Sequence, residues 1–300
     1  MSQNTYPKRV DSTLHSGTYV NEDLLSVQDG AAWVIDGTSG FSDRSLTDHP
    51  DSDGVWFVET ADAFLKEEMD AETPLPEIVA TVIERTVDEL QAELSIEPTL
   101  DTEDGAPVVS DAVSMHELPG ATIGLVRWDA STLEYYSLGD SSVLVTVDGT
   151  TERYIEGGPQ PFDAELCGEI EEYLRLNPDA SPDDVRSAFS STIRESRQYR
   201  EVPGGFWCLG VNPISARRAV YGHHSIDAVE YVSLFTDGLL NLVDPFEAFD
   251  GWDAVAEYIE THGTDAVVER TREIERADPS MREYPRLKPM DDVAVVHLEL

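Results

Sequence analysis

The ten residues AAWVIDGTSG at positions 31–40 join an unbroken apolar run to an acidic turn. An apolar run that is bounded by turn-forming residues is typical of a strand buried on both faces. Asp36 would then place a carboxylate at the end of the strand, and Gly37 would leave a backbone carbonyl accessible beside it. A carboxylate and a bare carbonyl are half of a site for a hard divalent cation. Because Asp-Gly is also a common turn pair, this interpretation depends on whether other stretches repeat the pattern.

Other acidic residues also stand beside strand-like stretches. Together with Asp36 they make a set of candidate metal ligands: Glu22, Asp23, Asp36, Asp140, Asp237 and Asp291. Carboxylates that converge at the ends of buried strands would repel one another and carry raised pKa values unless a cation lay among them. Mg²⁺ or Mn²⁺ suits such all-oxygen ligation. The seven His are scattered and form no cluster with Cys, which argues against zinc.

The charge of the chain is strongly negative, with 60 acidic and 20 basic residues and a formal net charge of -40. The acids are spread along the whole chain, and the only lysines are Lys8, Lys66 and Lys288. A dispersed acidic surface suits a protein that works in concentrated salt, where screening removes self-repulsion. An acidic mimic of nucleic acid is the alternative, but it would concentrate its charge on one face. Both interpretations disfavour binding to nucleic acid, because no basic patch is present to neutralise phosphates.

The first eleven residues are polar and lack the apolar segment of a signal peptide. No apolar run approaches the roughly 18–20 residues that a membrane-spanning helix needs. We therefore expect a cytoplasmic protein that does not insert in a membrane, and we expect it to be a monomer.

Hydrophobic periodicity predicts strands and helices in separate groups along the chain. Strands are expected at 17–20, 24–27, 31–36, 121–128, 132–138, 142–147, 152–155, 205–209, 216–221, 229–235 and 293–298, and helices at 55–69, 75–94, 162–175, 181–197, 251–261 and 264–276. Residues 1–16 are expected to be a loose lead-in, and residues 95–111 a loop. Such segregation favours an α+β fold in which helices flank two stacked antiparallel sheets. We expect one domain over residues 1–300, with a helical insert at about 158–200.

Short motifs over about residues 15–300 resemble those of the PP2C (PPM) family of metal-dependent serine/threonine protein phosphatases, and they occur in the family's order. They are Asn21-Glu22-Asp23, Val34-Ile35-Asp36-Gly37, Gly120-Ala121-Thr122, Leu138-Gly139-Asp140-Ser141, Leu234-Phe235-Thr236-Asp237-Gly238-Leu239 and Asp291-Asp292-Val293-Ala294-Val295-Val296. The resemblance implies a four-layer α-β-β-α sandwich, with the insert at 158–200 in the place of the family's variable flap. Combined with the acidic composition, it predicts a halophilic archaeal member of the family.

The resemblance also implies an activity: the hydrolysis of phosphoserine or phosphothreonine in a protein substrate, without a covalent enzyme intermediate. The attacking water would bridge two Mg²⁺ or Mn²⁺ ions, which lower its pKa and neutralise the phosphoryl oxygens. The implied catalytic residues are Asp36, Asp237 and Asp291. Asp36 would bridge the two ions, and Asp237 and Asp291 would complete the first.

The remaining implied ligands belong to the second ion and to a weaker third position. Glu22 and the Gly37 carbonyl would serve the second ion, Asp23 would hold a coordinated water, and Asp140 with Asp237 would match the third position.

Two departures from the family pattern concern the substrate. Thr18 stands where many members have an arginine that grips the substrate phosphate, and Thr38 stands where many have a histidine proposed to protonate the leaving group. Arg44 or Arg286 could bind the phosphate instead. These departures leave a second hypothesis open, in which the chain is a catalytically weak PP2C-like module that binds a phosphorylated or regulatory partner protein. A third hypothesis is an acidic decoy or scaffold without a metal site.

Overall fold

The computed structural model describes residues 7–42, 44–94, 113–157 and 161–300. Two five-stranded sheets are stacked face to face, and every pair of neighbouring strands is antiparallel. The first sheet has the order β1 (Arg9–His15), β10 (Val293–Glu299), β9 (Val229–Phe235), β6 (Ser142–Val147) and β7 (Thr150–Tyr154). The second has the order β2 (Asp23–Gln28), β3 (Ala31–Thr38), β4 (Gly120–Trp128), β5 (Thr132–Leu138) and β8 (Val220–Ser225).

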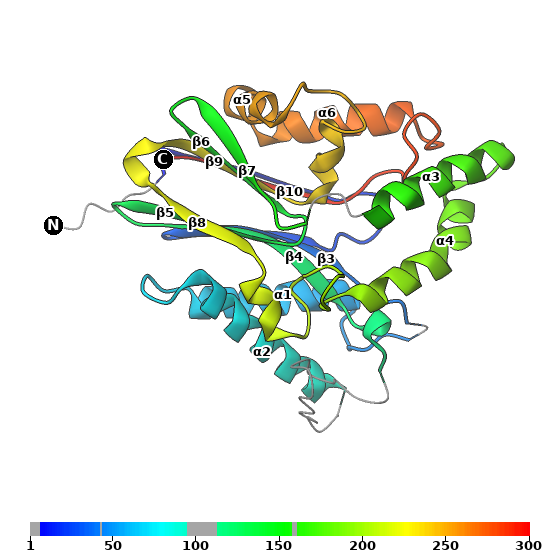
Figure 1. The fold of residues 1–300 in the computed structure, drawn as a ribbon, viewed down its shortest axis with the longest axis horizontal. Helices are drawn as coiled ribbons and strands as arrows, with labels where there is room; N and C mark the ends of the chain where they lie inside the picture. Colours follow the sequence, from blue (N-terminus) through cyan, green and yellow to red (C-terminus); the bar gives the residue numbers. More distant parts are fainter. Residues whose placement is uncertain (1–6, 43, 95–112, 158–160) are drawn as a thin grey trace.

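Helices cover the outer face of each sheet, which completes four layers (Figure 1). Helices α1 (Asp53–Glu68) and α2 (Leu75–Glu93) lie on the second sheet, and α5 (Trp252–His262) and α6 (Thr264–Ala277) lie on the first. Short 3-10 helices connect these elements: η1 (Met115–Glu117), η2 (Arg197–Tyr199), η3 (Pro213–Arg217), η4 (Ile226–Ala228) and η5 (Asp237–Leu242). The α+β sandwich that the sequence predicted is therefore confirmed.

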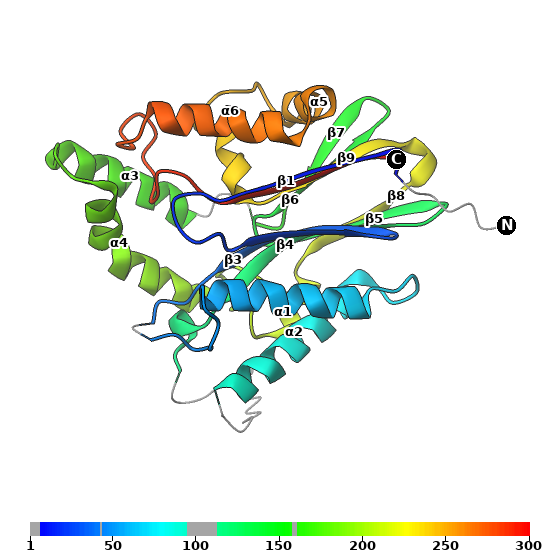
Figure 2. The ribbon, with the colours of Figure 1, turned by 180° about the vertical axis from the view of Figure 1, so that it is seen from behind.

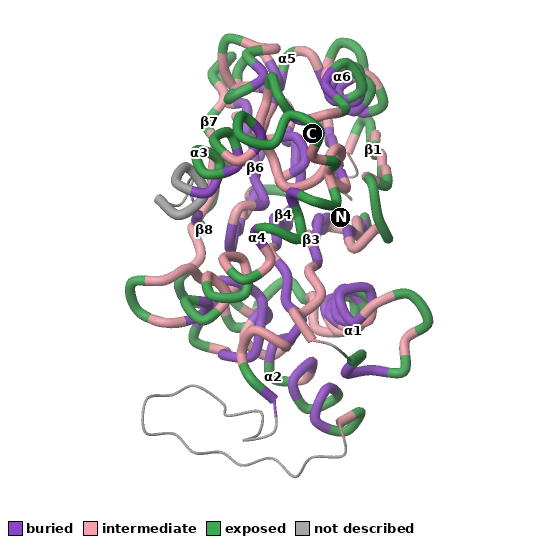
Figure 3. The backbone as a smooth tube through the Cα atoms, turned by 90° about the vertical axis from the view of Figure 1, so that its right-hand side faces the viewer, coloured by how far each residue is buried: buried purple, intermediate pink, exposed green. Residues whose placement is uncertain are grey.

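Strand β3 lies at the centre of this packing, and its two faces contact different layers. Ala32 and Val34 belong to the core between the sheets, whereas Trp33 and Ile35 belong to the core under α1 and α2. All four side chains are fully buried, which explains why the run is apolar at every position. Burying a side chain of this kind stabilises the fold by about 1.5–3 kcal/mol, so the strand end is held firmly. Figure 3 shows the same contrast along the chain, with buried strands inside and partly exposed helices outside.

Helices α3 (Pro161–Leu176) and α4 (Pro182–Ser196) lie beside the sandwich, at the end where β3 and β10 meet the connecting loops (Figures 1 and 2). They pack on each other through a small apolar cluster that includes Ile170, Val185 and Phe189. Met281, from the segment between α6 and β10, completes the cluster and ties it to the sandwich. In the described residues no helix is both long enough and apolar enough to cross a membrane.

The first part of the chain differs from the prediction. Residues 9–15, expected within the lead-in, form β1, which pairs with β10 at the edge of the first sheet. The strand buries no apolar side chain, because Asp11, Thr13 and His15 take the half-buried positions while Val10 and Leu14 are exposed. Residues 17–20, expected as a strand, form bends instead, and Thr18 donates its backbone N–H to the Met290 carbonyl at 3.0 Å.

Two later strands were also predicted wrongly. Residues 205–209 make only isolated bridges, Leu209 with Ala121 and Phe206 with Arg200, and do not form a named strand. The strand expected at 216–221 begins at Val220, because η3 occupies the residues before it. The loop expected at 95–111 lies outside the described residues.

Candidate metal centre

Acidic residues from both sheets meet at one end of the sandwich. In the second sheet, the antiparallel register places Asp23 directly opposite Asp36 on neighbouring strands. In the first sheet, Asp237 follows β9 and Asp291 stands two residues before β10. Because β9 and β10 are antiparallel neighbours, the last residues of β9 and the first residues of β10 lie at the same end of the sheet. Stacking of the sheets then brings the two acidic pairs together.

Glycines allow the backbone to approach closely at this end. A Cβ atom on Gly37 would lie 2.4 Å from the Glu22 carbonyl oxygen, and one on Gly238 would lie 2.0 Å from the Asp292 carbonyl oxygen. Both distances are far below van der Waals contact, so any other residue would push the two acidic strand ends apart. The Gly that follows each strand-terminal Asp is thus required by packing.

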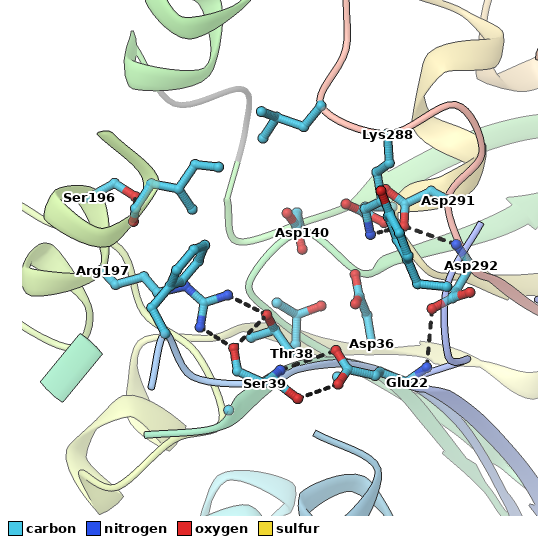
Figure 4. Close-up of a pocket in the computed structure, with 18 of the residues that line it drawn as sticks. Glu22, Asp36, Thr38, Ser39, Asp140, Ser196, Arg197, Lys288, Asp291 and Asp292 are labelled. Carbon is cyan, nitrogen blue, oxygen red and sulfur yellow. Dashed lines mark hydrogen bonds and ion pairs between the residues drawn. The ribbon is translucent and has the colours of Figure 1, made fainter. Parts of the chain in front are cut away.

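A pocket of about 900 Å³ opens between these strand ends and the α3–α4 pair. Its lining includes most of the predicted metal ligands: Glu22, Asp36, Gly37, Asp140, Asp237 and Asp291 (Figure 4). Asp23 is buried behind them, where its carboxylate accepts a hydrogen bond of 2.7 Å from the Thr236 hydroxyl. The structure thus brings the predicted residues to one place, while their individual roles as ligands stay predictions.

Burial and mutual repulsion act on these carboxyl groups together. Burial, followed by the charges of Asp23 and Asp140, raises the pKa of Asp36 well above its ordinary value. Burial, followed by the charge of Asp36, does the same to the pKa of Asp237. Such a cluster favours an added cation, because a positive charge relieves the repulsion without requiring protonation.

Lys288 supplies one positive charge to the cluster. Its ammonium donates to Asp291 Oδ1 and points into the group of carboxylates (Figure 4). Burial opposes the charge of Lys288, but the carboxylates of Asp291 and Asp237 outweigh it and raise the pKa of its ammonium. This single ammonium offsets only part of the repulsion among the carboxylates that surround it.

Glu22 is held by helix α1 and by the turn that follows β3. The Ser39 backbone N–H and the Ser52 hydroxyl donate to its carboxylate at 3.1 and 2.6 Å, and the Ser39 hydroxyl makes a further short bond. Ser52 also caps α1 by accepting the Val55 N–H at 3.1 Å. The start of a helix therefore orients this carboxylate toward the pocket.

Asp292 is a site residue that sequence reasoning did not select. Its carboxylate accepts the backbone N–H groups of Gly17 at 2.7 Å and of Glu22 at 3.1 Å, and it thereby joins the start of β2 to the start of β10. The Asp291-Asp292 pair was visible in the sequence. Both residues line the pocket, but only the three-dimensional placement shows that Asp292 also holds the backbone at the start of β2.

The donor chemistry fits a hard divalent cation. The cluster offers carboxylate oxygens and the Gly37 carbonyl, which are the ligands that Mg²⁺ and Mn²⁺ prefer. Among the described residues, however, no group of three or more His, Cys, Asp or Glu side chains is already arranged to hold one ion. A hard cation that keeps several of its waters needs only one or two of these carboxylates as direct ligands.

The two threonines at the family's substrate positions have different surroundings. The Thr18 hydroxyl donates to the Met290 carbonyl and accepts the Met290 N–H, both at 3.0 Å, so it fastens the loop before β10. Thr38 instead receives a hydrogen bond from Arg197, a residue of η2 that sequence reasoning did not consider.

The two predicted phosphate-binding arginines lie apart from the carboxylates or are engaged elsewhere. Arg44 is exposed on the loop after β3 and is not among the described residues that line the pocket. Arg286 does line it, but its guanidinium binds the Asp278 carboxylate at 2.9 Å and the Tyr284 and Pro289 carbonyls at 2.7 and 3.1 Å. Arg286 thus holds its own loop together.

Comparison with known proteins identifies the fold. No protein-family model and no curated protein matches the sequence. Among solved structures, the chain is similar to the serine/threonine phosphatase PstP/Ppp of Mycobacterium tuberculosis, with a TM-score of 0.53 and 14% identity, over 97% of this chain and 98% of that one. It is also similar to the serine/threonine phosphatase Stp1 of Staphylococcus aureus, with a TM-score of 0.51 and 14% identity, over 100% and 97% of the two chains.

A third similar structure is PppA, a key regulatory component of T6SS in Pseudomonas aeruginosa, with a TM-score of 0.53 and 16% identity, over 97% of each chain. These likenesses extend over the whole length of the chain and include both sheets. The protein has the fold of the PP2C-type serine/threonine phosphatases, as the motif resemblance implied.

Proposed function

We propose that this protein is a metal-dependent phosphoprotein phosphatase that hydrolyses phosphoserine or phosphothreonine. The observation that carries the proposal is the convergence of acidic strand ends from both sheets on one pocket of a PP2C fold. The sequence places those acids at the positions that the family uses for metal ligands. A binding module would not need to keep all of them.

In this proposal Asp36, Asp237 and Asp291 would hold one Mg²⁺ or Mn²⁺ ion, and Asp36, Glu22 and the Gly37 carbonyl would hold a second. Asp23 supports a coordinated water, and Asp140 contributes to a weaker third position. When bound, such ions lower the pKa of water and neutralise phosphoryl oxygens. The hydrogen bonds from Ser39 and Ser52 keep the Glu22 carboxylate turned toward the pocket before any ion arrives.

Thr38 shapes the substrate preference that we expect. A threonine hydroxyl does not release a proton readily near neutral pH, so it cannot serve as the general acid that a histidine would provide. Protonation by solvent is adequate for aryl phosphates, whose leaving groups are weak bases, and less so for serine or threonine alkoxides. We therefore expect faster turnover of aryl phosphates than of phosphopeptides.

The proposal also covers the setting of the reaction. We propose that residues 1–300 act as one catalytic domain with α3 and α4 as its flap, and that the protein works as a cytoplasmic monomer. The dispersed acidic surface, with a formal net charge of -40, supports adaptation to concentrated salt.

Hydrolysis of p-nitrophenyl phosphate and of a phosphothreonine peptide tests the proposal. Each substrate is assayed in dilute and in concentrated potassium chloride, with Mn²⁺, with Mg²⁺ and with EDTA. We expect metal-dependent turnover that persists in concentrated salt and falls by more than about 100-fold in Asp36→Asn and Asp237→Asn, since even supporting residues around a metal cost 10–100-fold. Asp88→Asn, the same chemical change on the exposed side of α2, is the matched control and should keep full activity.

The outcomes separate the hypotheses. Turnover that EDTA abolishes and both pocket variants lack supports the phosphatase. Metal binding without turnover of either substrate contradicts it and favours the partner-binding module. A wild-type protein that no divalent cation stabilises contradicts the metal centre altogether and favours the acidic scaffold.

A further inference from the structure

Arg197 reaches from the flap helices to the end of β3. It follows α4 directly, and one of its terminal nitrogens donates to the Thr38 hydroxyl at 2.5 Å. The other terminal nitrogen donates to the Ser39 carbonyl, and the guanidinium lies 4.9 Å from the centre of the Phe41 ring. Figure 4 shows the side chain directed from the flap toward Thr38 and Ser39, across the pocket from Lys288.

The partners of Arg197 differ from those of the arginines that form close ion pairs in this chain. Arg127, Arg272 and Arg286 each bind a carboxylate within 3 Å, with N–O distances of 2.5, 2.6 and 2.9 Å. In the described part of the chain, the hydrogen bonds of Arg197 go only to neutral oxygens and use two of the five N–H donors that a guanidinium carries. A desolvated guanidinium with spare donors is well suited to a phosphate, whose oxygens match its planar fork.

Arg197 also remains charged in this position. Burial, followed by repulsion from Arg200, lowers the pKa of Arg197 to about 10, which still leaves the guanidinium protonated at neutral pH. The charge of Glu22 offsets part of this loss of hydration, and an incoming anion would offset more of it.

Other basic groups around the pocket are committed or exposed. Arg200 is buried and donates to the Leu118 and Pro119 carbonyls at 3.2 and 3.1 Å. Arg186 is exposed and stacks on Tyr19, with its guanidinium 4.4 Å from the ring centre. Arg194 also lines the pocket from α4, but it is largely exposed to solvent. Lys288 binds Asp291 on the opposite wall.

We propose that Arg197 binds the phosphoryl group of the substrate, so that the flap supplies the contact that an arginine at position 18 supplies elsewhere in the family. This inference rests on the proposed function. The ligand would be a phosphomonoester dianion or orthophosphate. It would lie next to Gly37, because Thr38, the hydrogen-bond partner of Arg197, directly follows that residue. Arg197 lines the same pocket as Asp36 and Gly37, and its bond to Ser39 holds the side chain in place there.

Binding of orthophosphate, the reaction product, tests the assignment directly. Calorimetry on the Mn²⁺-loaded protein gives its affinity, and competitive inhibition of p-nitrophenyl phosphate hydrolysis gives an independent value. We expect Arg197→Met to weaken phosphate binding at least about tenfold, since hydrogen bonds to charged groups contribute about 1.5–3 kcal/mol. Arg197→Lys should lie between the two, because the charge remains but the fork is lost. Arg175→Met, the same change on the exposed face of α3 and outside the lining of the pocket, is the matched control and should bind phosphate like the wild type.

Thr38→Val separates phosphate binding from a purely structural role. It removes the hydroxyl that Arg197 holds but leaves the guanidinium in the pocket, so phosphate affinity should change by no more than about twofold. Equal losses in Thr38→Val and Arg197→Met would overturn the inference, because Arg197 would then only fasten the flap. Thermal unfolding of each variant verifies that it is folded. If Arg197→Met does not fold, the phosphate affinity of Arg197→Lys still tests the inference.

The two proposals fail in different ways. Metal-dependent hydrolysis with unchanged phosphate affinity in Arg197→Met would contradict the role of Arg197 and leave the phosphatase intact. Phosphate binding that depends on Arg197, in a wild-type protein that hydrolyses neither substrate, would support the role of Arg197 and contradict the phosphatase.

Discussion

The pocket has two walls that differ in charge and in construction. The sheet wall carries Glu22, Asp36, Asp237 and Asp291 on strand ends that are backed by the main cores. The flap wall carries Arg197 on a short helix next to α4, whose own contacts with the sandwich pass through a small apolar cluster. A rigid negative wall suits cations, and a separately attached positive wall suits an anion that arrives and leaves. The comparison implies that a variant in one wall acts mainly on the ligand of that wall, apart from any coupling through a residue that both walls contact.

The largest effect that we expect concerns the attachment of the flap wall. Glu201 is buried just after η2, and its carboxylate accepts the N–H groups of Val211 and Asn212 at 3.0 and 2.9 Å and the Ser215 hydroxyl at 2.9 Å. Glu201→Ala leaves these buried donors without an acceptor and should lower the free energy of unfolding by about 3 kcal/mol. Denaturant unfolding measures this loss.

Glu201→Gln is the control for this prediction, because it retains one carbonyl acceptor and should lose less stability. Where Glu201→Ala is still folded, its phosphate affinity should fall while its Mn²⁺ affinity stays near that of the wild type. A parallel loss of Mn²⁺ affinity would mean that the two walls are not independent.

The next effect concerns the sheet wall and depends on pH. Raised pKa values for Asp36 and Asp237 mean that the metal-free fold binds protons that the unfolded chain has released. The stability of the metal-free protein therefore falls as the pH rises through those values, and a bound cation should restore it. At about 100 times its dissociation constant, Mn²⁺ should add about 2.7 kcal/mol.

Thermal unfolding with and without Mn²⁺, near pH 5.5 and near pH 8, measures the difference. Because protons compete with the cation at the lower pH, the stabilisation by Mn²⁺ should be larger at the higher pH. Equal stabilisation at both values would place the bound ion away from these carboxylates.

The smallest effect concerns the one lysine of the sheet wall. Lys288 contacts Asp291, and its positive charge cancels part of the negative potential that would attract a cation. Lys288→Met should raise the affinity for Mn²⁺ a few-fold, as measured by calorimetry, and concentrated salt should reduce the gain by screening. Lys66→Met, which removes a lysine that pairs with Asp62 on α1, is the matched control and should leave the affinity unchanged. A weaker affinity in Lys288→Met would show that the ammonium supports the site.

The sheet wall could be predicted from the sequence because its signals are local. An apolar strand that stops at Asp-Gly identifies both its own burial and the acid at its end, as at Asp36 and Asp237. Strand β1 carried no such signal, because an edge strand with alternating exposure has few apolar residues to reveal it. The helices were predicted well, since each presents a continuous apolar stripe to a sheet.

The flap wall could not be predicted in the same way. Arg197 contacts Thr38 and Ser39, which precede it by more than 150 residues, and no local pattern marks such a pairing. Arg286, by contrast, was selected from the sequence and does line the pocket. Its N–H groups, however, already bind Asp278 and the carbonyls of its own loop. For an isolated arginine, the sequence shows that a positive charge is present but does not show which group the guanidinium binds.

Ser39 gives the two walls a common residue. Its N–H and hydroxyl hold the Glu22 carboxylate, and its carbonyl accepts a hydrogen bond from Arg197. An anion that draws Arg197 away from this carbonyl also disturbs the groups that orient Glu22. Thermodynamic linkage then requires reciprocity: the factor by which phosphate alters the affinity for the cation equals the factor by which the cation alters the affinity for phosphate. A single coupling free energy would then affect both the release of the phosphate product and the retention of the metal ion.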